Sequence, residues 1–97
     1  MHELKRFDEA VASYDRVLEM QPSSADVLAN RGVTLHQLKQ FEEALVSYDR
    51  ALAMRPDFAE ALNNRGLTLQ SMGHADEAAK DLARAKTVGP RLTEPKE

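Results

Sequence analysis

Three segments of nearly the same sequence follow one another along this chain at an interval of 34 residues. They begin with Phe-Asp-Glu-Ala, Phe-Glu-Glu-Ala and Ala-Asp-Glu-Ala at residues 7–10, 41–44 and 75–78. The tripeptide Asn-Arg-Gly also occurs twice at the same interval, at residues 30–32 and 64–66. A fixed period of this length is typical of a solenoid, in which each unit packs only on its neighbours. The repeat therefore predicts the architecture better than it predicts the function.

The size, charge and composition of the chain argue against several classes of protein. With 97 residues it forms one domain at most. A formal net charge of −3 and the lack of a run of Lys and Arg argue against binding to nucleic acid, which needs a clustered basic face. No apolar run approaches the roughly 18 residues of a transmembrane helix, so we expect no membrane partner. The chain has no cysteine and no signal-peptide pattern, which fits a cytoplasmic location.

In each segment between the Pro, Gly and Ser residues that favour turns, apolar residues recur at spacings of three and four, as they do in amphipathic helices. In the first such segment these residues are Ala10, Tyr14, Val17 and Leu18. We predict five helices, at residues 7–20, 25–38, 41–54, 59–72 and 75–88. The connections are two to four residues long, and links this short make neighbouring helices antiparallel. The predicted fold class is therefore all-α, built from stacked antiparallel helical hairpins.

Several residues have the types and spacings found at helix ends. Ser23 with Asp26, and Asp57 with Glu60, have the spacing of a capping box at a helix start. Gly73 can adopt the left-handed conformation that often ends a helix. We expect a helix to end just before the proline of each repeat, at residues 22, 56 and 90.

Two glycines lie in the middle of predicted helices, where glycine costs about 1 kcal/mol relative to alanine. They are Gly32 and Gly66, which occupy equivalent positions in the repeat. Because glycine lowers helix stability at the same position of both repeats, we infer that this position needs a small residue. The paired helix is therefore expected to approach closely there. We expect Tyr14, Tyr48 or Ala44 to fill the adjacent space.

One unit of the repeat has its key residues in a fixed order, at Leu28, Arg31, Gly32, Leu35, Ala44, Tyr48 and Pro56. A similar order returns at Leu62, Arg65, Gly66, Leu69, Ala78, Leu82 and Pro90. This pattern resembles the tetratricopeptide repeat (TPR), in an array of the bacterial type, and the resemblance covers nearly the whole chain. It implies an α-solenoid. Arg31 and Arg65 stand where the family more often has leucine, and we expect each stem to lie on apolar surface with its charged head in water.

The phase of the repeat divides the chain into four parts that together form one domain. We predict the second half of a truncated repeat at residues 1–22, full repeats at 23–56 and 57–90, and a disordered tail at 91–97. The chain thus begins midway through the first helix of a hairpin. Either that helix is a stub or the chain is a segment of a longer array, and we favour the second interpretation. The helix at 7–20 would then expose an apolar face able to pair with another copy.

The residue types needed for catalysis or metal binding lack suitable neighbours. His2, His36 and His74 have no His or Glu partner at metal-ligand spacing, and we interpret them as solvated surface residues. Ser13 and Ser47 have no neighbouring base that would make either a nucleophile. There is also no glycine-rich phosphate loop. We therefore predict no enzyme activity, no metal site and no cofactor.

The resemblance implies that the first helix of each hairpin lines the concave surface of the stack. On these helices, residues opposite the packing stripe recur at spacings of three and four, which places them in one row. We call this row the concave strip, and it consists of Asp26, Ala29, Asn30, Val33, Gln37, Glu60, Asn63, Asn64, Leu67 and Ser71. All of them except Ala29 are predicted to contact a bound peptide.

Asn30 and Asn64 are equivalent amides in the concave strip. An amide offers a donor and an acceptor together, which matches the backbone of an extended peptide. A similar asparagine ladder lines some tetratricopeptide superhelices, including that of O-linked N-acetylglucosamine transferase. The alternative is that asparagine is simply common at this position and hydrogen-bonds locally.

Members of this family also bind chaperone C-termini through a carboxylate clamp of lysine, arginine and asparagine. Asn30 fits one position of the clamp, but Glu60 and Asn64 stand where Lys and Arg are needed. Glu60 would repel a terminal carboxylate, so we predict that there is no chaperone clamp.

These observations favour a protein-interaction scaffold that binds an extended peptide or a partner helix in its concave groove. The predicted partner is therefore a protein or a peptide. One alternative is a structural spacer that self-assembles into a homo-oligomer through exposed solenoid ends. Another alternative is the recognition arm of a larger enzyme, such as a glycosyltransferase.

Overall fold

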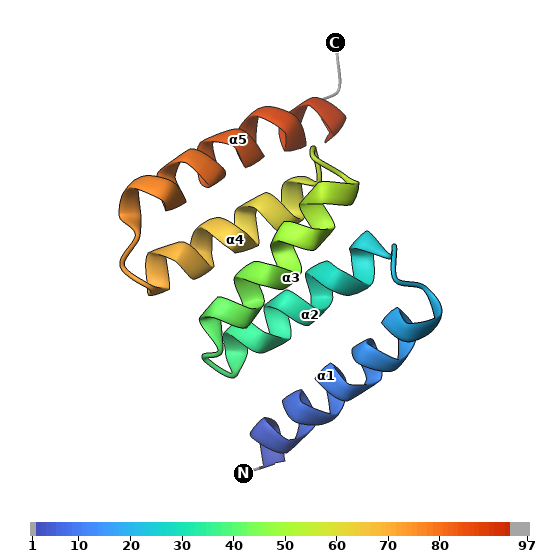
Figure 1. The fold of residues 1–97 in the computed structure, drawn as a ribbon. Helices are drawn as coiled ribbons and strands as arrows, with labels where there is room; N and C mark the ends of the chain where they lie inside the picture. Colours follow the sequence, from blue (N-terminus) through green and yellow to red (C-terminus); the bar gives the residue numbers. More distant parts are fainter. Residues whose placement is uncertain (1, 94–97) are drawn as a thin grey trace.

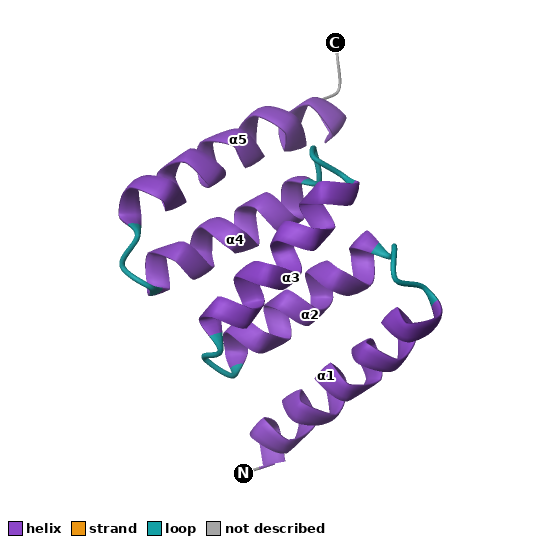
Figure 2. Ribbon diagram, in the orientation of Figure 1, coloured by secondary structure: helices purple, strands orange, loops and turns teal. Residues whose placement is uncertain are grey.

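The computed structural model describes the backbone of residues 2–93 and the side chains of residues 6–88. Five helices are present: α1 (His2–Met20), α2 (Ala25–Gln37), α3 (Phe41–Met54), α4 (Ala59–Ser71) and α5 (Ala75–Thr93). Figure 1 shows the helices stacked side by side, each running opposite to the one before it. Only short loops join them, as Figure 2 shows. The predicted all-α stack of antiparallel hairpins is confirmed.

Contacts between helices identify the inner side of the stack. Each helix packs against the next one in sequence, and α2 and α4 also contact each other. Within the described residues, α1 and α3 make no such contact, and neither do α3 and α5. Among described helices that are not consecutive in sequence, α2 and α4, the first helices of the two hairpins, are therefore the pair in contact. This is the arrangement expected on the concave side of a solenoid.

Close packing between the paired helices depends on the two mid-helix glycines. A Cβ atom added at Gly32 would lie 2.5 Å from Cε1 of Tyr48, which is buried with 1% exposure. A Cβ atom added at Gly66 would lie 2.8 Å from Cγ of Leu82. The close approach predicted at both glycines is confirmed. Tyr48 fills the space at Gly32, and Leu82 rather than a tyrosine fills it at Gly66.

The predicted capping residues are wrong at both helix starts. The N-cap of α2 is Ser24 rather than Ser23, because the Val27 N–H donates to Ser24 Oγ at 3.3 Å. The residue before α4 is Phe58, which makes no side-chain cap bond. Its ring is buried in the core with 8% exposure. The helix start thus has a buried aromatic ring at the N-cap position, in place of the side-chain hydrogen bond expected from Asp57.

Helix α1 starts at His2, well before the predicted start at Phe7. In the two inner repeats the equivalent segment turns, because α3 folds back on α2 and α5 folds back on α4. Among the described helices α1 contacts only α2. No contact between the described helices therefore imposes a turn near Arg6, and the helix propagates through this point.

Helix α5 continues through Pro90 to Thr93, although a stop was predicted before Pro90. The prolines of the other repeats follow helix ends, as predicted, because the chain there turns into the next helix. Of the described helices only α4 packs on α5, so no contact between described helices requires a turn at Pro90. Residues 91–93, where we expected a disordered tail to begin, are helical. Residues 94–97 of that predicted tail lie outside the described residues.

The turn inside each hairpin contains one residue in the left-handed region. Gly73 follows α4 with a φ of 88°, so the predicted stop signal is confirmed. Lys39 occupies the equivalent position after α2 and has a φ of 64°. A residue with a Cβ atom adopts this conformation at a cost of about 1–2 kcal/mol. The first hairpin turn therefore contains strain that the second avoids.

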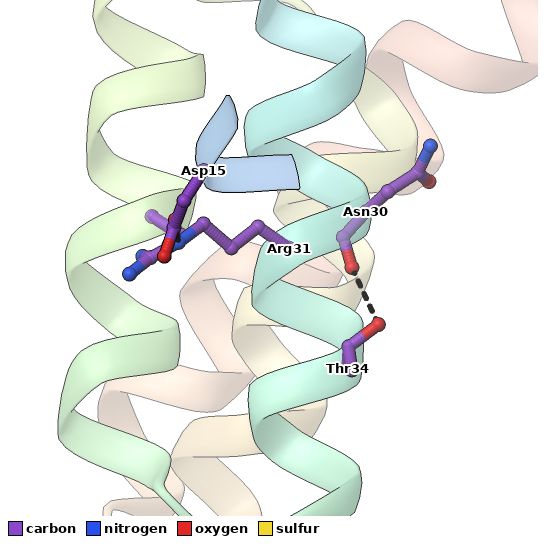
Figure 3. Close-up of polar contacts among 5 residues, drawn as sticks. Asp15, Asn30, Arg31 and Thr34 are labelled. Carbon is purple, nitrogen blue, oxygen red and sulfur yellow. Dashed lines mark hydrogen bonds and ion pairs between the residues drawn. The ribbon is translucent and has the colours of Figure 1, made fainter. Parts of the chain in front are cut away.

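Arg31 does not simply place its charged head in water, as we expected. Its Nε donates to Asp15 Oδ1 at 2.7 Å, and its Nη1 donates to Ser47 Oγ at 2.7 Å. Figure 3 shows the Arg31 side chain reaching across to Asp15. Only 21% of the Arg31 side chain is exposed. The guanidinium thus connects α2 to both α1 and α3.

Candidate functional site

A small pocket opens where α2 and α4 come together over α3. Its volume is about 120 Å³. We call it the α2–α4 pocket, and it is lined by Val33, His36, Gln37, Tyr48, Asn64 and Leu67. Four of these residues, Val33, Gln37, Asn64 and Leu67, belong to the concave strip. The pocket combines aliphatic walls with two side-chain amides.

Tyr48 is the contribution of α3 to the α2–α4 pocket. Burial raises the pKa of Tyr48 to about 12, and a hydrogen bond with Thr68 partly offsets this shift. The phenol therefore stays protonated near neutral pH. Tyr48 supplies the pocket with an uncharged aromatic surface whose position is fixed by packing against Gly32.

His36 is not a solvated surface residue, contrary to the prediction. Its Nδ1 lies 2.7 Å from Thr68 Oγ1, which connects α2 to α4. Its ring meets that of Phe41 edge-on, with 5.1 Å between the centroids. Burial lowers the pKa of His36. The ring is therefore neutral near pH 7 and offers one donor and one acceptor.

Sequence reasoning missed both His36 and Tyr48 as pocket residues. Tyr48 was assigned to packing, and it packs while also lining the pocket. The hydroxyl partner of His36 is 32 positions away in sequence. The position equivalent to His36 in the next repeat holds Gln70, so periodicity gave no signal for this histidine.

Six members of the concave strip lie outside the α2–α4 pocket, and three of these are Ala29, Asp26 and Ser71. Ala29 is 3% exposed and belongs to the core, so its assignment to the strip was wrong. Asp26 Oδ1 accepts a hydrogen bond from Arg55 Nη1 at 3.1 Å. Ser71 Oγ donates to the carbonyl oxygen of Leu67 at 3.2 Å. The last two are thus already engaged within the molecule.

Glu60 and Asn63 line a second hollow, which lies between α4 and α5. The other residues of this hollow are Ala59, Ala85 and Lys86. The members of the concave strip on α4 are therefore divided between two depressions. We call this second depression the α4–α5 hollow.

Asn30 is exposed, and Figure 3 shows its side chain pointing away from Arg31. The carbonyl oxygen of Asn30 accepts a hydrogen bond from Thr34 Oγ1 at 3.1 Å. Among the hydrogen bonds of the described residues, none involves the side-chain amide of Asn30 or of Asn64. The local hydrogen bond at Asn30 thus involves its backbone carbonyl and not its side chain. The side-chain amides of Asn30 and Asn64 therefore keep their capacity for hydrogen bonds.

The polar groups of the α2–α4 pocket are two amides, an imidazole and a phenol. These groups can donate and accept hydrogen bonds, and they provide no fixed charge near neutral pH. Within residues 6–88, no group of three or more His, Cys, Asp or Glu side chains is placed to hold a metal ion. Among the helices of the described chain, none has the length and apolar character needed to cross a membrane.

Comparison with protein-family models identifies the repeat directly. A model described as "TPR repeat" matches residues 1–39 and 34–73, and a model described as "Tetratricopeptide repeat" matches residues 58–89. No curated protein matches the chain. The family matches overlap, so our division at residues 22, 56 and 90 stays a prediction.

Solved structures with the same fold include two of MamA. The structure titled MamA MSR-1 is 28% identical with a TM-score of 0.84, and the match covers 93% of this chain and 52% of that one. Another MamA crystal structure is 19% identical with a TM-score of 0.86, covering 97% of this chain and 55% of that one. The chain therefore spans about half of the length of the MamA structures it matches.

A third similar structure is the second TPR of Spaghetti (RPAP3) bound to the HSP90 peptide SRMEEVD. It is 22% identical with a TM-score of 0.82, and the match covers 84% of this chain and 76% of that one. At this identity the likeness concerns the fold alone. The family models together match most of the sequence. The chain belongs to the tetratricopeptide repeat family.

Proposed function

We propose that this chain is a protein-interaction module that holds an extended peptide, or a partner helix, along the concave strip. The α2–α4 pocket is the observation that carries the proposal. Its aliphatic and aromatic surface can take an apolar side chain, and its amides can bond the adjoining backbone. The described residues that line it form no charged or metal-binding centre.

The amides of Asn30 and Asn64 suit the backbone of an extended peptide. Such a peptide presents one N–H and one C=O at each non-proline residue, and both need partners when they leave water. Neither amide has a hydrogen-bond partner among the described residues. The exposed position of Asn30 and the place of Asn64 in the pocket support the same ligand geometry.

The proposal is tested by selecting binders from a library of randomised octapeptides that are capped at both ends. We expect the variant Asn30→Ala/Asn64→Ala to bind a selected peptide about tenfold more weakly, because two hydrogen bonds of about 0.5–1.5 kcal/mol each are lost. Helicity and melting temperature should not change, since both residues face the ligand side. Fluorescence anisotropy and circular dichroism measure the two properties.

Gln70→Ala is the matched control for this experiment. Gln70 is an exposed amide on α4 that lines neither the α2–α4 pocket nor the α4–α5 hollow. Its replacement should leave the affinity unchanged. Equal binding by the wild type and the double variant would contradict the proposed role of the two asparagines.

One observation favours self-assembly as a second candidate function. Val17 of α1 is 39% exposed, whereas Ala51, at the equivalent position of α3, is completely buried. The α1 face that carries Val17 is therefore suited to cover by a second copy of the chain. Sedimentation equilibrium at several concentrations tests this idea. A monomer at every concentration would exclude it, and so would a dimer that persists unchanged when Val17 is replaced by Glu.

A further inference from the structure

The concave strip has an acidic residue at the same position in both repeats, but only one of the two is neutralised. Asp26 pairs with Arg55 at 3.1 Å. Glu60 stands one repeat later, and the position equivalent to Arg55 is Gly89, which offers no cation. Among the ion pairs of the described residues, none involves Glu60. Lys86 lines the same α4–α5 hollow without pairing with it.

Glu60 lies on the same face of α4 as the residues that form the α2–α4 pocket. At about 100° per residue, Glu60, Asn64 and Leu67 fall within about 60° of one another around the helix. At a rise of about 1.5 Å per residue, Glu60 lies about 8 Å along the axis from the midpoint of Asn64 and Leu67. An extended peptide covers this distance in two or three residues, at about 3.3 Å each.

The volume of the α2–α4 pocket suits one large apolar side chain. Its size of about 120 Å³ is close to that of a cavity that takes up a benzene ring, roughly 150 Å³. The walls formed by Val33, Leu67 and the Tyr48 ring offer apolar contact. Neutral His36 and the nearby amides leave no charge that would favour an ionised side chain there.

We infer that the concave strip selects an internal segment of extended peptide with a large apolar residue in the α2–α4 pocket and a lysine or arginine two or three residues away, beside Glu60. This inference rests on the proposed peptide-binding function and adds the sequence that is preferred. A free carboxyl terminus is disfavoured, because the concave strip contains no cationic side chain.

Selection from the capped octapeptide library with the wild type and with Glu60→Lys tests the inference. The wild type should enrich peptides with the apolar and basic residues at the stated spacing. Glu60→Lys should keep the apolar preference and exchange the basic residue for Asp or Glu. Replacing the basic residue of a selected peptide by glutamine should weaken wild-type binding about two- to fivefold, as expected for an exposed ion pair, and less at high salt.

Glu42→Lys is the matched control, because Glu42 is the second residue of α3 as Glu60 is of α4, and both are exposed. This variant should retain the wild-type preference. Enrichment of apolar peptides without a basic residue, or a basic preference that survives in Glu60→Lys, would overturn the inference while peptide binding itself stands. No enrichment by the wild type beyond that of Asn30→Ala/Asn64→Ala would overturn both proposals.

Discussion

Arg31 in α2 lies 2.7 Å from Asp15 in α1, measured from Nε to Oδ1, and so joins one repeat to the next. The equivalent pair, Arg65 and Asp49, is 3.4 Å apart between the same atoms. In both repeats the arginine is therefore a bridge between successive repeats, which a leucine at this position would not provide. At both positions where this chain departs from the usual family pattern, the arginine thus makes an ion pair with the preceding repeat.

The first prediction concerns the two hydrogen bonds of the Arg31 side chain, which contribute unequally to the free energy of unfolding. Asp15 is 49% exposed, so its ion pair contributes at most about 1 kcal/mol. Ser47 is completely buried, and loss of its partner costs about 1–3 kcal/mol. We expect Arg31→Ala to lower the free energy of unfolding by about 2 kcal/mol and Asp15→Ala by less than 1 kcal/mol. Urea titrations followed by circular dichroism give both values, and equal losses would show that the bond to Ser47 is unimportant.

The second prediction concerns the close approach at Gly32. Gly32→Ala improves helix propensity by about 1 kcal/mol, but the new Cβ would lie 2.5 Å from the buried Tyr48 ring. Overpacking of this kind costs about 1–3 kcal/mol, and a shift of the ring would disturb the packing that buries it to 1% exposure. We expect a net loss of up to about 2 kcal/mol, or up to roughly 16 °C in melting temperature.

Gly66→Ala provides the comparison for Gly32→Ala. Here the new Cβ lies 2.8 Å from Cγ of Leu82, which is only partly buried and can change rotamer, and 3.2 Å from the carbonyl oxygen of Ala78, a milder contact. The melting temperature of Gly66→Ala should therefore fall less than that of Gly32→Ala. The packing argument fails if thermal melts place the two variants in the opposite order.

The third prediction concerns the strained turn at Lys39. Its φ of 64° is unfavourable for a residue with a Cβ atom, whereas the equivalent Gly73 has a φ of 88° at no such cost. We expect Lys39→Gly to raise the free energy of unfolding by about 1 kcal/mol. Gly73→Ala should lower it by a similar amount, although no atom lies within 4 Å of the added Cβ. Chemical denaturation measures both changes in the free energy of unfolding. An increase for Lys39→Gly and a decrease for Gly73→Ala would confirm that backbone conformation, rather than side-chain contacts, decides both changes.

The repeat was sufficient to predict the inner helices and their packing. The bounds of α3, Phe41–Met54, agree with the prediction, and the glycine contacts follow from the same periodic pattern. Helix ends were less predictable where tertiary contacts decide them. Phe58 precedes α4 without capping it, because burial of its ring outweighs a side-chain cap at this position.

The residues of the candidate site that occur at equivalent positions in both repeats could be predicted from the sequence. The residues without an equivalent in the other repeat could not. Val33 and Leu67 are equivalent residues, and both line the α2–α4 pocket. His36 has no equivalent histidine, and it is placed by Thr68, a partner in the next repeat. Ala29 was misplaced since its spacing fits the concave strip, while the approach of neighbouring helices buries it.

The fourth prediction concerns pH. The pKa of His36 is lowered by burial in the folded protein, so below its ordinary value of about 6.5 the unfolded chain binds more protons than the folded one. The contribution of His36 to stability is therefore full above pH 6.5 and is lost as the pH falls through the lowered folded pKa. The free energy of unfolding should decrease over this interval.

His36→Gln isolates this effect, since Gln70 shows that the repeat accepts an amide at the equivalent position. The variant should lose less stability than the wild type when urea titrations are repeated from pH 7.5 downward. Asp81 acts in the opposite direction, because burial raises its pKa. Protonation of Asp81 in acid therefore stabilises the folded state in both proteins. Parallel pH profiles would exclude His36 as the source of the decrease.

The last prediction concerns the acidic peptide SRMEEVD, which the RPAP3 domain binds. Its terminal carboxylate favours cations, whereas Glu60 and Asn64 are the residues that the family resemblance places at the Lys and Arg positions of a clamp. We expect no binding at low micromolar concentration in a calorimetric titration, because Glu60 repels the acidic peptide. The variant Glu60→Lys/Asn64→Arg introduces both cations into the concave strip and should bind the peptide detectably, with an affinity that falls as salt is added. Low micromolar binding by the wild type would contradict the charge argument, and it would also refute the preference for basic peptides.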